Sequence, residues 1–446
     1  MPTPPTPATG PGRLGTGARV VYLPVNRPFE AAFRSVAAEV TALPEAARAG
    51  VTLLVVDDCG PAVSRANREV CNAVVREAGP RVRVLAADGW RRLVNDLLAA
   101  ADLKDQHRSI AGTALVKPSG SYGAGPNKAA LIAALEDAVS LHRRDSDQIT
   151  ATDPGTGASP LRIEAELFDR ARAGSGPAPY CVGSSLTGRP TRDRRDLEHG
   201  SAAYVERIDA LSRLPADPPR PQLPDRPERA ALHGGQHAER DYTGTVEMGI
   251  AALREVHEWI PEMPAVGILG SDYFQKGLLY QLDLPVYHHA RTARHVYEPW
   301  RARQSSDAHL EWYARAELRY TVLRRHWNAF NRLLTADPAQ VLRDGHFDQA
   351  AYAELFVEAL HKGTEGVQNI PGEFVAVYRE AAAGASGDVR RRLAVRVAAL
   401  EEEAETAVGY VADAIHEFTG LTRLWPRLVA AARQLGRTNG LAVYTS

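Results

Sequence analysis

The first part of the sequence alternates between short apolar runs and longer helical stretches, and this alternation limits what the chain can fold into. Residues 18–24, 51–56 and 81–85 are apolar, β-branched runs of strand length. Residues 29–43 and 61–79 lie between them and are predicted helices. Strands that alternate with helices predict a mainly parallel sheet. Ligands of such sheets bind beyond the carboxyl ends of the strands, so residues at those ends are the first site candidates.

Polar side chains follow the first two predicted strands. The first strand stops at Pro24, and Asn26 lies in the loop after it. The second strand ends in Asp57 and Asp58. These residues occupy the rim where a ligand would bind. One of the two aspartates is equally well explained as a cap for the helix that begins near Pro61, which leaves the other for a ligand.

A glycine-rich stretch, residues 119–128, leads into a helix and ends in Asn127 and Lys128. Glycines before a helix allow backbone N–H groups to approach an anion. The stretch matches neither the phosphate-binding loop, in which Ser or Thr follows the Lys, nor the dinucleotide G-x-G-x-x-G pattern. A plain turn is the alternative interpretation. The helix itself is predicted to have one apolar stripe, which includes Leu131 and Leu135.

The triplet Asp145-Ser146-Asp147 places two carboxylates one residue apart, at the end of a further predicted strand. Two carboxylates at this spacing can bind one divalent cation, which would neutralise the phosphates of a bound nucleotide. The alternative is a charged turn in which the aspartates pair with Arg143 and Arg144.

Taken in order, these elements resemble the GT-A fold of nucleotide-sugar-dependent glycosyltransferases. The shared order is a strand with a Pro-x-Asn loop, a strand ending in Asp-Asp, a glycine-rich loop with Asn-Lys opening a helix, and D-x-D. The resemblance implies a nucleoside pocket in which Asp57 or Asp58 bonds the base. The residues that it assigns to the nucleoside or nucleotide are Pro24, Asn26, Asp57, Asp58 and Lys128.

The same resemblance implies that Asp145 and Asp147 hold the metal ion and the diphosphate. The sequence departs from the family at this point, because an apolar strand normally precedes D-x-D. Here the approach is Ser-Leu-His-Arg-Arg, residues 140–144. These basic residues either face the phosphates or mark a short strand.

Residues 266–274 are the second informative stretch, an apolar predicted strand that ends in Gly270-Ser271-Asp272 and leads into a helix. They resemble the GT-A element that lies beneath the acceptor. The resemblance implies that Asp272 takes a proton from the acceptor hydroxyl in an inverting enzyme, or holds the acceptor in a retaining one. It places Ser271 in the substrate site. A helix N-cap is the alternative for Asp272.

His295 follows a further predicted strand, residues 284–289, and resembles the late histidine of GT-A enzymes. The resemblance implies that it is the third protein ligand of the metal. Neutral imidazole suits Mn²⁺ better than Mg²⁺. A structural role is the alternative, and His288 or His289 could serve in its place.

The predicted domain organisation has four parts. Residues 1–17 form a disordered tail rich in Pro, Thr and Gly, without the apolar segment of a signal peptide. Residues 18–150 form the nucleotide-binding half and residues 151–304 the acceptor-binding half of a GT-A-like domain. Residues 305–446 form a helical domain. Its predicted helices are 310–334, 347–361, 374–383, 389–418 and 424–435.

The net charge of −1 gives no reason to expect nucleic acid or an anionic membrane as a partner. No apolar run approaches the roughly 18–20 residues of a membrane-spanning helix. The cysteines, Cys59, Cys71 and Cys181, have no metal-binding spacing, and their small odd number indicates a reducing cytoplasm.

The sequence therefore predicts an α/β fold, a GT-A-like Rossmann-type mixed sheet flanked by helices, with an appended C-terminal α-helical bundle. The predicted function is a metal-dependent, hexosyl-type glycosyltransferase that uses Mn²⁺ or Mg²⁺ and a nucleotide-diphosphate sugar. We expect a small-molecule acceptor, a role in secondary metabolism, and a homodimer through the helical domain. The alternatives are a nucleotidyltransferase on a related sheet and a non-catalytic binding protein with a degenerate GT-A scaffold.

Overall fold

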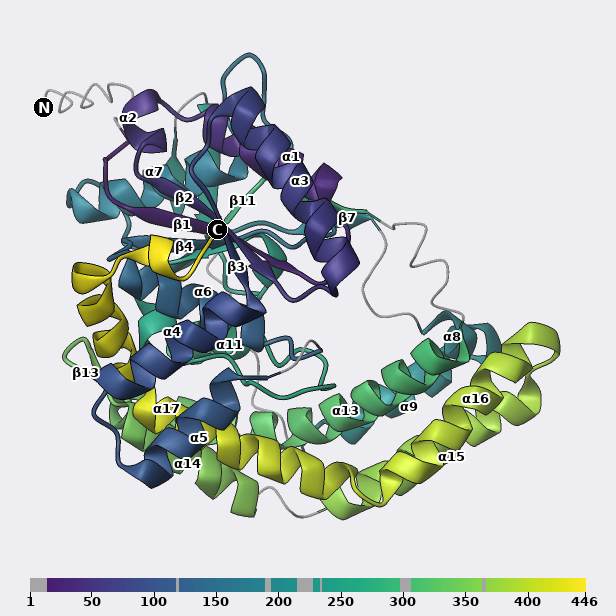
Figure 1. Cartoon of the computed structure of the whole chain (residues 1–446). Helices are drawn as coiled ribbons and strands as arrows, with labels where there is room; N and C mark the ends of the chain where they lie inside the picture. The colour runs from purple at the N-terminus through teal and green to yellow at the C-terminus, as the bar shows by residue number, and fades with distance from the viewer. Residues whose placement is uncertain are drawn as a thin grey trace, which may run out of the picture.

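The computed structural model describes residues 14–117, 120–188, 194–214, 228–232, 235–296, 306–362 and 366–446. Its main sheet has nine strands in the order β3-β2-β1-β4-β10-β6-β11-β9-β8. Helices cover both faces of this sheet, and the helices of the last third of the chain extend away from it (Figure 1). The predicted fold class, a mixed α/β sheet flanked by helices with a helical C-terminal region, is confirmed.

The first four strands of the main sheet are parallel to one another, and the strands beyond them run in both directions. The main sheet consists of β1 (Arg19–Val25), β2 (Val51–Asp57), β3 (Val82–Ala86), β4 (Ser140–Arg143), β6 (Cys181–Gly183), β8 (Arg229–Ala231), β9 (His237–Arg240), β10 (Ala251–Leu253) and β11 (Val286–His289). A smaller sheet, in the order β5-β12-β7, consists of β5 (Gln148–Ile149), β12 (Ala293–His295) and β7 (Leu186–Gly188). A short hairpin joins β13 (Leu342–Arg343) to β14 (His346–Phe347).

The helices of the first half are α1 (Glu30–Thr41), α2 (Glu45–Arg48), α3 (Pro61–Ala78), α4 (Ala87–Ala100), α5 (Asp105–Leu115), α6 (Ala124–Leu135) and α7 (Pro160–Arg172). Those of the second half are α8 (Arg195–Gly200), α9 (Ala202–Leu211), α10 (Val256–Trp259), α11 (Phe274–Gln281), α13 (Asp307–Ala336), α14 (Gln349–Lys362), α15 (Ile370–Gly384), α16 (Gly387–Ala404) and α17 (Ala407–Thr438).

The central strands are buried on both faces, which explains their uninterrupted apolar sequences. Val21 and Leu23 of β1 pack into the layer formed by α1 and α3. Val20 and Tyr22, which point to the opposite face, pack into the layer formed by α4, α5, α6 and α17. Alternate side chains of a strand point to opposite faces, so both sets must be apolar when helices cover both sides.

Helix α6 differs from its prediction, because all of its residues are buried rather than one stripe. It lies between the sheet and α17, and both of its faces therefore meet apolar partners. The contact with α17 is close: a Cβ added at Gly436 would lie 1.9 Å from the backbone oxygen of Leu135. The C-terminal helix thus completes the core on this side of the sheet. The predicted boundary at residue 305 and the rest of the domain division stay predictions.

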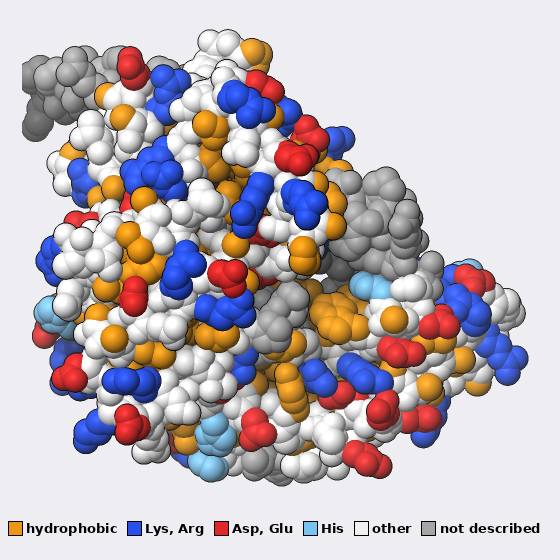
Figure 2. Space-filling model, viewed as in Figure 1, with side chains coloured by type: hydrophobic (Ala, Val, Ile, Leu, Met, Phe, Trp, Pro, Cys, Tyr) orange, Lys and Arg blue, Asp and Glu red, His pale blue; other side chains and the backbone are white. Residues whose placement is uncertain are grey.

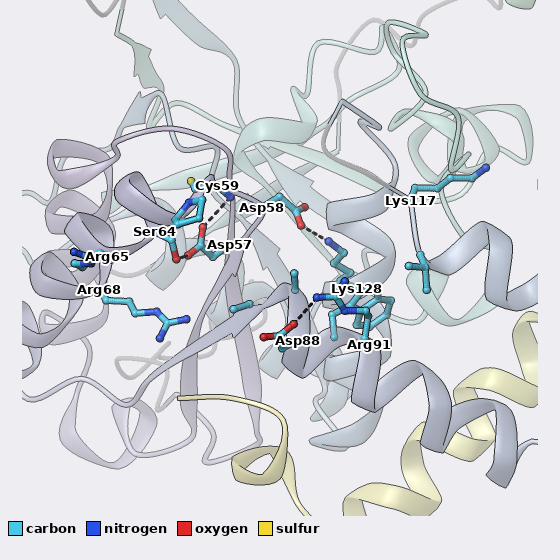
Figure 3. Close-up of a pocket in the computed structure, with 15 residues that line it drawn as sticks. Asp57, Asp58, Cys59, Ser64, Arg65, Arg68, Asp88, Arg91, Lys117 and Lys128 are labelled. Carbon is cyan, nitrogen blue, oxygen red and sulfur yellow. Dashed lines mark hydrogen bonds and ion pairs between the residues drawn. The ribbon is translucent and has the colours of Figure 1, made fainter.

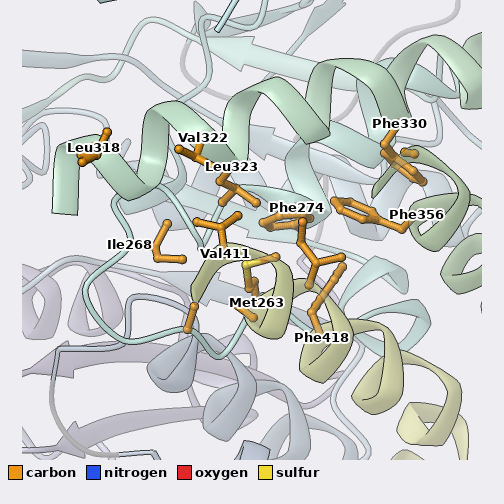
Figure 4. Close-up of a cluster of buried hydrophobic side chains, with 14 of the residues drawn as sticks. Met263, Ile268, Phe274, Leu318, Val322, Leu323, Phe330, Phe356, Val411 and Phe418 are labelled. Atoms are coloured by element: carbon orange, nitrogen blue, oxygen red, sulfur yellow. The ribbon is translucent and has the colours of Figure 1, made fainter. Parts of the chain in front are cut away.

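Figure 4 shows how the helical region holds the segment that precedes α11. Met263, Ile268 and Phe274 pack against side chains of α13, α14 and α17. The ring of Phe274 lies 4.7 Å from that of Phe418 and 4.4 Å from that of Trp327, measured between centroids. The helical region therefore positions the stretch that contains Asp272.

Two predicted elements are wrong. Residues 266–274 do not form a strand, because Gly267 and Gly270 have positive φ values of 63° and 67°, which interrupt extended backbone. The predicted helix 389–418 is two helices, which part after Ala404. The second of them, α17, continues through Gly420 and Pro426. Burial of its apolar face against α4, α5 and α6 outweighs the hydrogen bond that the proline removes.

Strand β4 has a polar sequence and is nevertheless buried. His142 and Arg144 point to one face, where Glu164 accepts from His142 Nδ1 at 2.7 Å and from Arg144 Nη2 at 3.0 Å. Glu39 of α1 accepts from Arg144 Nε at 3.0 Å. Arg143 points to the other face. Buried carboxylates on neighbouring helices therefore replace the apolar contacts that a strand in this place normally makes.

No helix in the described ranges combines the length and the apolar character that crossing a membrane requires. Of the predicted disordered tail, residues 1–13 lie outside the described residues. Gly15 donates its backbone N–H to Asp169 Oδ2 at 2.6 Å, so the last residues of the predicted tail contact α7.

Candidate active site

The turn after β4 brings Asp147 and His295 together. Residue 148 begins β5, which pairs with β12 so that Gln148 lies opposite His295. The backbone N–H of Val296 donates to the carbonyl oxygen of Asp147 at 2.8 Å. The side chains meet as well, with 3.5 Å between His295 Nε2 and Asp147 Oδ2. Two residues far apart in the sequence, each predicted as a metal ligand, are thus neighbours.

Arg27 also engages the Asp147 carboxylate. Its Nη1 lies 2.7 Å from Asp147 Oδ2. The loop that presents Arg27 follows β1 and is held in place by Asn67 of α3, whose Nδ2 donates to the carbonyl oxygen of Arg27 at 3.0 Å. Asn26 is exposed and accepts from Arg27 Nε at 2.9 Å. A cationic side chain is therefore fixed at the carboxyl end of β1.

Asp145, by contrast, does not join Asp147 and His295. Its carboxylate accepts from Arg143 Nε at 2.7 Å and from Gln148 Nε2 at 3.4 Å. It also lies directly over Gly249, where an added Cβ would be 2.6 Å from Asp145 Oδ2. The backbone N–H of Asp145 donates to the carbonyl oxygen of Gly249 at 3.0 Å. The two aspartates of D-x-D therefore pair with two different arginines.

Arg143 joins Asp145 to Asp272, with 2.7 Å between its Nη2 and Asp272 Oδ2. The third nitrogen, Nη1, is buried and has no hydrogen-bond partner within the described residues. Burial alone would lower the pKa of Arg143, but the carboxylates of Asp145 and Asp272 raise it well above its ordinary value. The guanidinium group therefore remains charged at any physiological pH.

Asp272 is buried, and burial raises the pKa of its carboxyl group above the ordinary value. The nearby Arg143 opposes this shift, and the charge of Asp145 adds to it. Asp272 is not the cap of α11. The first two N–H groups of that helix, from Phe274 and Gln275, donate to Glu262 instead, at 2.7 and 3.2 Å. The Asp272 carboxylate is therefore free of a capping role.

Ser271 is buried beside Asp272, and its Oγ has no hydrogen-bond partner in the described part of the chain. Its carbonyl oxygen accepts from the backbone N–H of Met263 at 3.0 Å. The loop that contains Met263 is fastened in turn by Asn127 of α6, which accepts from Glu262 N at 2.7 Å and donates to Glu262 O at 2.8 Å. The Asn of the glycine-rich stretch thus positions the predicted acceptor segment.

A cavity of about 730 Å³ opens at the carboxyl ends of β2 and β3 (Figure 3). A volume in the range of roughly 300–1,000 Å³ is typical of small-molecule sites. Figure 2 shows Lys and Arg side chains on this face over α3 and α4. The residues that line the cavity include Asp58, Arg65, Arg68, Trp90, Lys117 and Lys128.

The two aspartates after β2 have different surroundings. Asp57 accepts from the backbone N–H of Cys59 at 3.0 Å and from the hydroxyl of Ser64, so it fixes the loop that begins α3 (Figure 3). Asp58 points into the cavity and forms an ion pair with Lys128 (Figure 3). Asp58 is therefore the aspartate that can meet a ligand.

Pro24 lies where α6 approaches β1. A Cβ added at Gly125 would be 3.0 Å from the Pro24 Cβ. The glycine at this position of the predicted anion-binding stretch therefore permits a close contact between helix and strand.

The predicted metal site is incomplete in this arrangement. Within the ranges that the structure describes, no group of three or more His, Cys, Asp and Glu side chains is placed to hold a metal ion. Asp147 and His295 supply two ligands, and Asp145 faces Arg143. His289 does not replace it, because its Nε2 lies 3.8 Å from the buried Glu164, in the network behind β4. These residues do not fit the predicted three-ligand site.

The sequence matches a known family profile over residues 19–178 and 240–440, described as a family of unknown function, DUF6271. The chain belongs to the DUF6271 family. A search of curated proteins found no match to this DUF6271 member.

Two solved structures are similar to this DUF6271 chain. One is the mannosyltransferase PcManGT from Pyrobaculum calidifontis in complex with GDP-Man and Mn²⁺, with 12% identity and a TM-score of 0.37, over 97% of this chain and 90% of that chain. The other is S. aureus TarS 1-349 in complex with UDP-GlcNAc, with 10% identity and a TM-score of 0.37, over 87% of this chain and 91% of that chain. Both matches are distant.

Sequence patterns do not single out three residues that shape this site, Arg27, Arg143 and Glu262. Arg27 carries a weak signal, because it follows the Pro-x-Asn loop. Arg143 is part of the basic approach to D-x-D, and its pairing with Asp145 agrees with the charged-turn alternative. Glu262 has no signal, because the helix that it caps begins well after it in the sequence. The roles predicted for the site residues of this DUF6271 member stay predictions.

Proposed function

We propose that this chain transfers a sugar from a nucleoside diphosphate donor to a small-molecule acceptor. The observation that supports it is a nucleoside-sized cavity followed, along one edge of the sheet, by two arginine–aspartate clusters. The cavity lies at the ends of β2 and β3, Arg27 and Asp147 lie beyond β1, and Arg143 and Asp272 lie beyond β4. This order corresponds to nucleoside, diphosphate and sugar in an extended donor.

In this proposal the nucleoside occupies the cavity. Asp58 accepts an N–H of the base, and the ion pair with Lys128 orients its carboxylate. Pro24 and Asn26 border the same rim, and Asp57 supports the loop without touching the ligand. Trp90 closes the cavity with a ring whose centroid is 5.9 Å from Lys128 Nζ.

The reaction breaks the bond between the anomeric carbon and the oxygen of the β-phosphate, and the electron pair leaves with the diphosphate. The acceptor oxygen forms the new bond to the anomeric carbon. In an inverting transfer, Asp272 accepts the proton of that hydroxyl, and its raised pKa suits a general base. In a retaining transfer, Asp272 and Ser271 hold the acceptor, and the departing diphosphate takes the proton of the hydroxyl. The anomeric configuration of the product distinguishes the two courses.

The sequence also predicts Mn²⁺ or Mg²⁺ on Asp145, Asp147 and His295. A bound divalent cation would neutralise the diphosphate. Since Asp145 is held by Arg143, Gln148 and Gly249, the proposed reaction includes no step that passes through a metal. Transfer of a hexose, a role in secondary metabolism, a cytoplasmic location and a homodimer through the helical region are further proposals from the sequence.

The test is calorimetric titration with UDP, GDP, CDP and TDP, followed by assay of the preferred nucleotide's sugars for release of the diphosphate. We expect one base to bind preferentially and its sugar conjugate to be consumed. Tighter binding of the nucleoside triphosphate than of the diphosphate would favour a nucleotidyltransferase. Binding of none of these nucleotides, either with or without Mn²⁺ or Mg²⁺, would favour a non-catalytic binding protein.

Asp58→Asn is expected to weaken binding of the preferred nucleoside diphosphate by roughly 10- to 100-fold, which corresponds to the loss of one hydrogen bond to a charged group. The reason is that the amide keeps the shape but places a donor and a neutral acceptor against the base. Titration calorimetry measures the change. Asp105→Asn, at an exposed position in the first turn of α5, is the control and should bind like the parent protein. Equal affinities for all three proteins would remove Asp58 from the nucleoside site.

A further inference from the structure

We infer that this chain stabilises the departing diphosphate with charged N–H donors of its own guanidinium groups, Arg27 and Arg143, and that Asp147 and Asp145 serve to orient these two arginines. The inference rests on the proposed function, because it specifies how the same site binds its donor. It replaces the metal ion expected from the sequence by cations that the fold supplies.

Arg27 is in the position to meet the diphosphate. Arg27 follows β1 and lies next to the nucleoside cavity. The cavity residue Cys59 contacts the carbonyl oxygen of Arg27, and so does Asn67. Its side chain is 19% exposed, so ligand oxygens can reach it. The pair with Asp147 and the nearby His295 fix its direction.

Arg143 has one N–H donor group that the fold has already oriented for a ligand oxygen. Two of its nitrogens are occupied by Asp145 and Asp272, each at 2.7 Å. The third, Nη1, is buried without a hydrogen-bond partner among the described residues. A buried donor that is left unpaired costs free energy, and an anionic oxygen of the ligand would remove that cost. The side chain is 8% exposed, and its two ion pairs hold this donor in a single direction.

Asp145 is prevented from turning toward Asp147 by three contacts. Arg143 and Gln148 donate to its carboxylate, and Gly249 lies against one of its oxygens. A third metal ligand would require these contacts to break. The Asp145 carboxylate instead holds Arg143 together with Asp272. In this arrangement two aspartates align one arginine, and no side chain has to move.

Guanidinium groups suit this task chemically. Negative charge grows on the β-phosphate as the glycosidic bond breaks, and fixed cations aimed at that oxygen stabilise the transition state. An arginine never deprotonates in the physiological range, and its planar fork matches two phosphate oxygens at once. Two oriented arginines therefore direct charged N–H donors at the diphosphate, while their own charges are shared with Asp145, Asp147 and Asp272.

The experiment measures binding of the preferred nucleoside diphosphate to the full chain by calorimetry, first in EDTA and then with Mn²⁺ or Mg²⁺. We expect affinity in EDTA within about threefold of that with metal. Arg27→Met should lower the affinity in EDTA by roughly 10- to 100-fold while leaving the affinity for the free nucleoside unchanged, and Arg27→Lys should restore part of it. Arg34→Met, an exposed arginine of α1, is the control and should bind like the parent protein.

Binding that occurs only with Mn²⁺ or Mg²⁺ would overturn the inference and leave the proposed function intact. The same holds for an Arg27→Met protein that binds the diphosphate as the parent does. Absence of nucleotide binding in both conditions would overturn the proposed function together with the inference. The parent fold is checked in every case by the midpoint of thermal unfolding.

Discussion

Asp272→Asn is expected to lower kcat by roughly 10²- to 10⁴-fold, the usual contribution of a general base. The carboxylate is buried, and its ion pair with Arg143 orients it for one direction of attack. The amide keeps the volume of the side chain but cannot accept the acceptor's proton. Affinity for the nucleoside diphosphate should change little, because the amide oxygen can still accept from Arg143 Nη2 and keep that guanidinium group aligned. The measurement combines steady-state turnover with calorimetry.

Asp283→Asn is the matched control for this substitution. Asp283 follows α11, is 85% exposed and pairs with Arg240, away from the site. It should show parental kcat and affinity. A loss of less than about tenfold in the kcat of Asp272→Asn would be smaller than the loss expected for a general base, and Asp272 would then not be the base. Loss of nucleotide affinity without loss of kcat would instead place Asp272 against the donor.

Turnover should also depend on pH through Asp272. Burial raises the pKa of this carboxyl group above its ordinary value, with Arg143 opposing and Asp145 adding to the shift. The base acts only when ionised, so kcat should be full above the raised pKa and should fall as the pH drops through it. The profile of kcat against pH tests this, and its acid limb should be absent from the residual activity of Asp272→Asn. An acid limb that persists in the variant would belong to another group.

Glu39→Leu is expected to destabilise the protein by about 3–5 kcal/mol, as removal of one partner from a buried ion pair does. Glu39 is fully buried and accepts four hydrogen bonds: from Arg144 Nε and Nη2 at 3.0 and 3.2 Å, from Thr150 Oγ1 at 2.6 Å and from Leu161 N at 2.8 Å. The substitution leaves a buried guanidinium group with Glu164 as its remaining carboxylate partner among the described residues. Unfolding in urea, followed by circular dichroism, measures the loss.

Glu30→Leu, on the same helix, makes the same chemical change in an ion pair that is 58% exposed on the glutamate side. It should cost less than about 1 kcal/mol, because exposed pairs contribute little. Glu39→Gln keeps the shape of the side chain, and its loss of stability should lie between those of Glu39→Leu and Glu30→Leu. This variant preserves the comparison if Glu39→Leu does not fold. Equal midpoints for Glu39→Leu and Glu30→Leu would show that the network behind β4 does not stabilise the fold.

How far the site could be predicted depends on how local each signal is. Asp58, Lys128 and Asp147 are visible because they follow strands or open a helix, and those patterns need only a few neighbouring residues. The pairing of Asp147 with His295 could be expected only through the resemblance to a known fold. Arg143 could not be assigned, because its two carboxylate partners come from the D-x-D turn and from the segment before α11.

The sequence by itself determined the alternation of strands and helices, since the two- and 3.6-residue periods of apolar side chains act over short distances. It also determined which polar residues stand at the carboxyl ends of the strands. Only the tertiary structure decided that α17 would continue through Gly420 and Pro426, because burial against α4, α5 and α6 compensates for the weak local preference. The pairing of Asp145 with Arg143 is local and agrees with the charged-turn alternative. Only the tertiary structure decided that Gly249 lies against the Asp145 carboxylate and that Asp272 holds the same arginine, because both residues come from distant segments.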